Sequence, residues 1–196
     1  LCDRAILLER GFVIKDGPPE EVRDFYNALI AERENATVEV NRLDDGRAQT
    51  TSGTGEARVA SIELRNEQGE TVEYVNVGEP VRLEVKIRLH ADLPELVFGY
   101  MIKDRLGQSV FGTNTHHLKV KMAQLKKDEL LTLVFSFPAN IGLGSYSVST
   151  ALHVADTHLA TNYEWRDQAL MFNVVNVNRD QFVGVNWIPP LVEYQR

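Results

Sequence analysis

Cysteine, long apolar runs and positive charge are all scarce in this sequence of 196 residues. Cys2 is the only cysteine, so an internal disulfide is impossible, which fits a reducing compartment. No apolar run approaches the roughly 20 residues that span a bilayer, and no basic and then apolar signal segment opens the chain. A net charge of −7 argues against a sequence-independent nucleic-acid binder, which needs a cationic surface. We therefore expect a cytoplasmic protein with no membrane span and no nucleic-acid partner.

Motifs of nucleotide-dependent enzymes and serine hydrolases are missing as well. The sequence has no G-x-x-x-x-G-K-[ST] loop, no G-x-G-x-x-G turn and no G-x-S-x-G elbow. Its carboxylates are scattered, whereas a glycosidase needs two of them about 5–10 Å apart across a cleft. His153 and His158 flank a turn with Asp156, but hydrogen-bonding histidines near a strand end are commoner than metal ligands. We predict no catalytic residue, no metal and no cofactor in this chain; a carbohydrate-processing enzyme is a minor alternative.

The first 34 residues predict a hairpin followed by a helix. Apolar runs at 4–8 and 12–15 surround Glu9-Arg10-Gly11, a tight turn. Two prolines and two glutamates at 18–21 then suit the first turn of a helix. One apolar stripe continues that helix: Val22, Phe25, Tyr26 and Leu29. Residues 35–56 have too few apolar side chains to offset ordering entropy, so they predict a flexible linker, with a long surface loop as the alternative.

From Ala57 to the end at residue 196 the sequence predicts a β-sandwich domain. Apolar and polar residues alternate in several short segments, as in strands with one buried and one solvated face. The clearest apolar sets are Val81, Leu83, Val85, Ile87 and Leu89; Leu96, Phe98, Tyr100 and Ile102; Leu131, Leu133, Phe135 and Phe137; and Tyr146, Val148, Thr150, Leu152 and Val154. No helical pattern separates these segments. The fold class expected is mainly β, an immunoglobulin-like antiparallel sandwich.

The opposite side of three of these strands is small, polar and uncharged over much of its length. If the segments near 96–103, 144–153 and 169–175 are neighbours, that side forms a shallow trough of hydroxyl and amide groups. Trp165, Tyr163 and Trp187 would supply an aromatic platform for a sugar. The glycan-binding residues predicted on this argument are Met101, Lys103, Ser147, Ser149, His153, Asn173, Trp165 and Trp187. A solvated sheet face and a protein interface are the alternatives. The basic cluster Lys119, Lys121, Lys126 and Lys127 is a weaker candidate, for an anionic group.

Two parts of the sequence resemble known families. The residues at 2–11 and 16–22, followed by Tyr26, resemble the hairpin and helix that end an ABC-transporter nucleotide-binding domain. The β-rich remainder resembles Wzt-type subunits, which export O-antigen polysaccharide with a membrane permease. The segments that carry this second resemblance are Ile62-Glu63-Leu64, Val77-Gly78-Glu79-Pro80, the stretch 98–107, Val110-Phe111-Gly112-Thr113-Asn114-Thr115 and Gly144-Ser145-Tyr146.

The resemblance implies a non-catalytic domain that binds the modified end of the O-antigen polysaccharide and selects it for export. It implies a homodimer formed by exchange of a C-terminal strand, for which the apolar segment 182–187 is suited. It also places the ATPase motifs, ATP and Mg²⁺ in an upstream domain, of which residues 1–34 are the tail, at the cytoplasmic side of the inner membrane. Docking of the permease or of a glycan-assembly enzyme is the alternative function.

Overall fold

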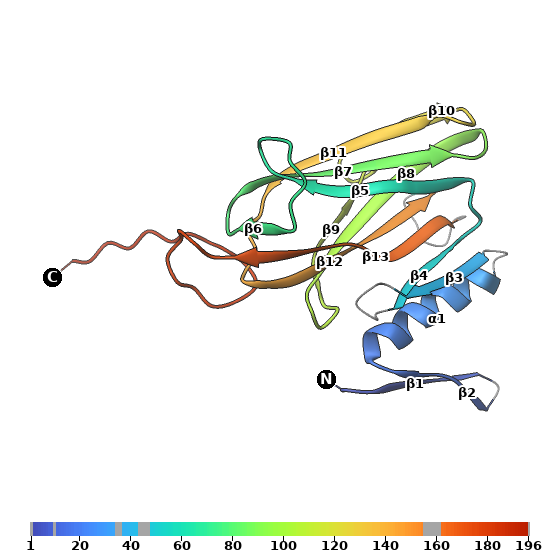
Figure 1. Cartoon of the computed structure of the whole chain (residues 1–196), viewed down its shortest axis with the longest axis horizontal. Helices are drawn as coiled ribbons and strands as arrows, with labels where there is room; N and C mark the ends of the chain where they lie inside the picture. Colours follow the sequence, from blue (N-terminus) through green and yellow to red (C-terminus); the bar gives the residue numbers. More distant parts are fainter. Residues whose placement is uncertain (1, 10, 34–36, 43–47, 155–161, 196) are drawn as a thin grey trace.

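A computed structural model describes residues 2–9, 11–33, 37–42, 48–154 and 162–195 (Figure 1). An N-terminal hairpin and one helix precede a body of strands. In chain order the elements are β1 (Ala5–Glu9), β2 (Phe12–Gly17), α1 (Pro19–Arg33), β3 (Thr37–Arg42), β4 (Ala48–Gly53), β5 (Ala57–Arg65), β6 (Tyr74–Asn76), β7 (Pro80–Leu89), β8 (Leu93–Lys103), β9 (Ser109–Asn114), β10 (Met122–Leu125), β11 (Leu130–Pro138), β12 (Gly144–His153) and β13 (Asn162–Val175).

The strands after α1 form two sheets that enclose one core. The larger sheet has the order β10-β8-β12-β13-β4-β3, with β9 paired to β8 and β6 paired to β13. The smaller sheet has the order β11-β7-β5. All pairs are antiparallel except β6 with β13. The predicted antiparallel sandwich is confirmed, and the condition set for a shared outer face is met, since β8, β12 and β13 are neighbours.

Alternation of side chains along the strands explains the core. Every second residue of β7, from Val81 to Leu89, is at most 2% exposed, while the residues between them point outward. Across the core Phe98 is fully buried, and its ring lies 5.6 Å from that of Phe135. Burial of each large apolar side chain contributes roughly 1.5–3 kcal/mol. The apolar sets named from the sequence therefore face the interior, and the polar sets lie on the two outer faces.

The predicted linker is the main correction to the expected domain organisation. Within residues 35–56, β3 and β4 pair with each other, and β4 extends the larger sheet through Ser52 opposite Trp165. Ser52 is 2% exposed, and Gly53 sits so close to β13 that an added Cβ would lie 2.1 Å from the carbonyl oxygen of Tyr163. Backbone pairing and small hydroxyl side chains hold β4 in place, which low apolar content does not reveal. The flexible linker does not hold for 37–42 and 48–53.

The hairpin and the helix form where the sequence predicts them. β1 and β2 pair in register from Ala5 opposite Gly17, and α1 begins at Pro19 with two acidic residues in its first turn. α1 contacts β4, β3 and β13, so it lies along one end of the larger sheet (Figure 1). Val22 is buried by this contact, whereas Tyr26 of the predicted stripe is half exposed.

The C-terminal segment after β13 does not form the strand expected at 182–187. Among the described residues, its only β-bridge joins Asn186 to Ile141. Trp187 packs on Phe182, with ring centroids 5.0 Å apart. Beyond it the chain runs away from the sandwich, and Leu191 and Val192 are almost fully exposed (Figure 1). Exchange of this segment with a second copy is not tested by these contacts and stays a prediction.

Candidate functional site

A pocket of about 220 Å³ opens on the outer face of the larger sheet, on the side away from the core. Strands β8, β9, β12 and β13 supply most of its walls. The lining residues are Gly99, Tyr100, Met101, Gly112, Thr113, Asn114, His117, Ser149, Ala151, His153 and Trp165. Hydroxyl, amide and imidazole groups thus surround one indole ring.

Four of the eight predicted glycan-binding residues meet in this pocket: Met101, Ser149, His153 and Trp165. Strand register explains why, since Met101 of β8 lies opposite Ser149 of β12. One step further along β12, Ala151 lies opposite Trp165 of β13. Three side chains from separate strands therefore converge because they share one face of neighbouring strands. Of the aromatic residues predicted as a platform, Trp165 lines the pocket, whereas Tyr163 is buried and Trp187 lies elsewhere.

The other four predicted residues lie outside the pocket. Lys103 and Ser147 continue the same strip beyond the pocket; at 3% and 6% exposed they are no more buried than Ser149 and His153 within it, at 1% and 2%. Asn173 sits near the opposite end of β13, where it accepts a hydrogen bond from Ser145 at 2.7 Å. Trp187 belongs to the C-terminal segment, whose single bridge is to Ile141 rather than to this face. The strip was expected to face water along its length; instead it is largely buried and opens at the pocket.

Sequence reasoning missed the contribution of β9 to the pocket. Antiparallel pairing places Gly112 opposite Met101 and Asn114 opposite Gly99. The two glycines leave space that a side chain would fill: a Cβ on Gly112 would meet only ordinary contacts with Tyr100 and Met101, the nearest at 3.5 Å. Glycine within a strand often marks a close approach of a ligand or of backbone. Glycines stand at positions 99 and 112 of the sequence, but the sequence does not show that β9 pairs with β8.

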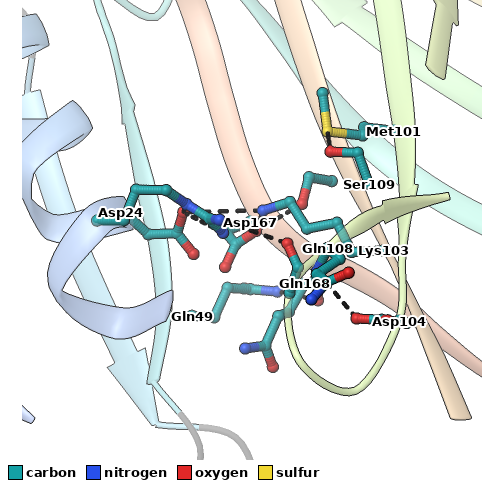
Figure 2. Close-up of polar contacts among 12 residues, drawn as sticks. Asp24, Gln49, Met101, Lys103, Asp104, Gln108, Ser109, Asp167 and Gln168 are labelled. Atoms are coloured by element: carbon teal, nitrogen blue, oxygen red, sulfur yellow. Dashed lines mark hydrogen bonds and ion pairs between the residues drawn. The ribbon is translucent and has the colours of Figure 1, made fainter. Parts of the chain in front are cut away.

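Beside the pocket, the same face carries a buried ion-pair network (Figure 2). The Nζ atom of Lys103 lies 2.8 Å from Oδ1 of Asp167 on β13 and 3.7 Å from Oδ1 of Asp24 on α1. The hydroxyl of Ser149 donates to the same Oδ1 of Asp167. Asp24 and Asp167 are 4% and 2% exposed. The residue chosen from sequence as a sugar contact, Lys103, instead joins the helix to the sheet.

The two aspartates of this network differ in proton affinity. Burial raises the pKa of Asp24 to about 7, and the hydrogen bond and negative charge of Asp167 add to that rise. Burial also tends to raise the pKa of Asp167, but the hydrogen bond from Asp24 and the charge of Lys103 outweigh it and lower the pKa to about 2. At pH values between these two pKa values the pair therefore holds one proton, carried on Asp24, which is about half lost at pH 7.

Glu20 brings a third carboxylate within 4.8 Å of the other two. Burial raises the pKa of Glu20, and the charge of Asp167 raises it further. Three such oxygens resemble a cation site, but the ammonium group of Lys103 already lies against two of them. The lysine thus supplies positive charge to the buried carboxylate cluster. Asp156 and His158, weighed from the sequence as metal ligands, lie outside the described residues.

The lysine cluster considered for an anionic group is divided in space. Lys126 and the backbone N–H of Lys127 bind the carboxylate of Asp92, at 3.0 and 2.8 Å. Lys119 and Lys121 line a separate hollow at β8 and β10, together with His116 and Glu95. The four lysines therefore do not form one anion site.

Comparison with known proteins decides the family. The family model of the Wzt C-terminal domain matches residues 48–188. The chain belongs to the Wzt C-terminal domain family. The match begins with β4, which agrees with the placement of that strand in the sandwich rather than in a linker. Among the curated proteins none matches this chain.

Solved structures are similar to this Wzt C-terminal domain to different degrees, and the first below shares its fold. The crystal structure of the C-terminal domain of wzt is 17% identical, with 74% of this chain and 89% of that chain covered and a TM-score of 0.66. A Niemann-Pick type C2 protein from the Japanese carpenter ant is 12% identical, with coverage of 63% and 97% and a TM-score of 0.43. The CARDB domain of the PF1109 protein from Pyrococcus furiosus is 15% identical, with coverage of 63% and 99% and a TM-score of 0.36.

Family membership gives the domain a role in the ABC export system for O-antigen, as a non-catalytic part. Within the described residues, the structure has no helix that is both long enough and apolar enough to cross a membrane.

Proposed function

We propose that this Wzt C-terminal domain binds the O-antigen polysaccharide at its modified terminus and thereby selects finished chains for export, without catalysing a reaction. The observation that carries the proposal is the pocket in which Met101, Ser149, His153 and Trp165 meet. Polar groups around an aromatic ring match the chemistry of a sugar, whose hydroxyls need partners and whose ring face is apolar.

The size of the pocket favours the end of a glycan over its middle. Its volume of about 220 Å³ is below the roughly 300–1,000 Å³ of pockets that enclose drug-sized ligands. One sugar residue with a substituent suits such a space better than several residues of a chain. Nε1 of Trp165 is buried and has no hydrogen-bond acceptor among the described residues, so a ligand oxygen that reaches it would gain a satisfied donor.

Binding of wild-type protein to polysaccharide tests the proposal directly. The ligand is O-antigen from the organism that encodes the chain, prepared with and without its terminal modification, and affinity is measured by titration calorimetry. We expect saturable binding only to the modified form. Equal affinity for both forms would contradict recognition of the terminus, and binding to neither would contradict recognition of the glycan.

A paired set of variants locates the site. Gly112→Leu adds a side chain over the pocket, and its Cβ meets no backbone atom closer than 3.5 Å. We expect it to raise the dissociation constant by about tenfold or more, the equivalent of roughly 1.4 kcal/mol. Thr132→Leu places the same side chain at an exposed position of β11, on the other sheet, and should leave affinity unchanged. Equal binding by both variants would move the site elsewhere.

The partners follow the same proposal. The domain works as a homodimer beside the membrane permease, at the cytoplasmic face of the inner membrane, with ATP and Mg²⁺ bound by an upstream domain. Exposed Leu191 and Val192, and an apolar groove at the edge strand β11, support exchange of the C-terminal segment. Sedimentation of a chain truncated after residue 178 tests it: a stable monomer of unchanged solubility would contradict the exchange.

Docking of another protein is the second candidate. The hairpin favours it, because Leu8 and Phe12 are 64% and 75% exposed on β1 and β2. Such a surface suits a protein contact. If neither form of the polysaccharide binds, co-purification with the permease tests this function. We expect the wild-type chain to co-purify with the permease and the Phe12→Ser variant to lose that contact.

A further inference from the structure

Ser149 belongs to the pocket and to the buried network at the same time. Its side chain lines the pocket, and its hydroxyl donates to Oδ1 of Asp167. A hydroxyl has one proton to donate, so the direction of this bond decides what Ser149 offers to a ligand. While Asp167 accepts that proton, the Ser149 oxygen is left to act as an acceptor toward the pocket.

The position of Asp167 depends in turn on helix α1. Lys103 bridges the carboxylates of Asp167 and Asp24, and none of the three residues is more than 4% exposed. Removal of one partner from such a buried group leaves the others with uncompensated charge or unmet hydrogen bonds. The contacts therefore continue without interruption from α1 through β8 and β13 to the pocket (Figure 2).

The helix also holds the turn between two strands of the pocket. Arg23 donates to the carbonyl of Gly107 at 3.3 Å, in the turn that joins β8 to β9. Glu20 packs against the same glycine, since a Cβ there would lie 2.7 Å from its carboxyl carbon. β8 and β9 carry Met101 and Gly112 on the pocket wall. Docking of α1 thus constrains the pocket at two places, through the Lys103–Asp167 ion pair and through the turn between β8 and β9.

From these contacts we propose that Asp24 is a positioning residue of the pocket: through Lys103 and Asp167 it fixes the Ser149 hydroxyl, so that docking of α1 and occupancy of the pocket are coupled. The inference rests on the proposed function for the identity of the ligand. Coupling between two sites is reciprocal: a ligand that binds better with the helix docked must tighten the helix. The proposed coupling links glycan binding in the pocket to helix α1, which precedes the sandwich.

The charges around Asp24 set how the coupling depends on pH. With Asp24 protonated, Lys103 balances Asp167; loss of that proton adds a buried negative charge, so docking weakens as pH rises through about 7. The charged groups around Asp24 and its neighbour Glu20 are Glu21 and Arg23 of α1, Lys15 of β2, Lys103 and Asp104 at the end of β8, and Asp167 of β13. Lys15 pairs with Glu21 at 3.2 Å, which leaves Lys103 as the main buried counter-charge.

Two measurements on the full chain test the coupling. Hydrogen–deuterium exchange of α1 amides reports docking without any ligand, and calorimetric titration with the modified O-antigen reports the pocket. Ser149→Ala removes only the hydroxyl in the pocket and should raise exchange in α1. Asp24→Ala should weaken polysaccharide binding by about fivefold or more, within the usual range of coupling. Asp24→Asn mimics the protonated side chain and should keep affinity near wild type while removing its change between about pH 5.5 and pH 8.

Asp16→Asn is the matched control, because Asp16 is an exposed carboxylate of the hairpin that pairs with Arg4. This substitution should change neither the exchange of α1 amides nor the affinity for polysaccharide. The coupling is overturned if Ser149→Ala leaves α1 exchange unaltered, or if Asp24→Ala binds polysaccharide like wild type at every pH. If wild-type protein binds no polysaccharide, the proposed function fails, and the Ser149→Ala exchange result still judges the coupling alone. Near-ultraviolet circular dichroism confirms that each variant is folded.

Discussion

One carboxylate, Glu164 on β13, ties the two sheets together through a backbone hydrogen bond. It is 2% exposed, and its Oε2 accepts from the backbone N–H of Val59 on β5 at 2.9 Å. Between Val59 and Ser61 the pairing of β5 with β7 shifts by a residue. A strand that slips there leaves an N–H without its ladder partner, and the side chain of the other sheet supplies the acceptor. Substitution of Glu164 therefore measures this inter-sheet contact.

The size of the effect follows from the two groups that lose a partner. Glu164→Ala leaves the buried N–H of Val59 without an acceptor, which costs about 1–3 kcal/mol. It also removes Oε1, which accepts from Nη2 of Arg166 at 3.0 Å; that arginine is 24% exposed, so its loss adds about 1 kcal/mol at most. The sum is about 1–4 kcal/mol. For a chain of this length it lowers Tm by roughly 2–16 °C.

Glu164→Gln is the matched comparison, because its amide oxygen still accepts from Val59 while the charge is lost. We expect it to cost about 1 kcal/mol or less. Urea denaturation followed by far-ultraviolet circular dichroism gives the free energy of unfolding of both variants. If Ala and Gln variants agree within about 0.5 kcal/mol, the contact to Val59 contributes nothing and the reasoning is refuted.

Three further predictions test the other parts of the description. Gly53→Ala should lower the free energy of unfolding by about 1–3 kcal/mol or more, since its Cβ would collide with the backbone of Tyr163; Gly69→Ala, whose Cβ meets open space, should cost about 1 kcal/mol. Protection of α1 amides, corrected for chemical exchange, should fall as pH rises through about 7 because Asp24 loses its proton, and again as pH falls from about 4 toward 2 because Asp167 gains one. In Trp187→Phe the remaining indole lies in the pocket, so its fluorescence should still respond to polysaccharide, whereas Trp165→Phe should abolish the response.

Strands with strict alternation were predictable because their burial follows a period of two. In β7 and β8 each apolar set faces the core, as the residues indicate, but Val97 and Lys103 on the other side of β8 are buried as well. Four of the eleven residues that line the pocket followed from this rule together with the assumed strand adjacency. Met101 and Ser149 were named on the correct face because parity along a strand fixes the side on which each residue lies.

Strand order and long-range polar partners were not predictable in the same way. β4 has almost no apolar residue, and what holds it is backbone pairing to β13. Alternation along a strand shows on which face of the sheet a residue lies, but it does not show what covers that face. Lys103 was therefore predicted to contact a sugar. Asp24, which covers it, lies far away in the sequence and pairs with Lys103 only after α1 docks. A pairing between distant residues leaves no local pattern.

Because Lys103 is buried, only part of the outer face of the larger sheet is open to a ligand. A solvated trough would offer many weak and interchangeable contacts along its length. Here the helix and the ion pairs occupy one end of the strip, and the glycines of β8 and β9 keep the other end open. If the proposed function holds, a site limited in this way accepts one terminal sugar group and excludes internal segments of the polysaccharide by sterics. Under that proposal, selection of a polysaccharide end follows from where α1 docks, and a variant whose helix cannot dock should bind polysaccharide less tightly and with less discrimination between modified and unmodified ends.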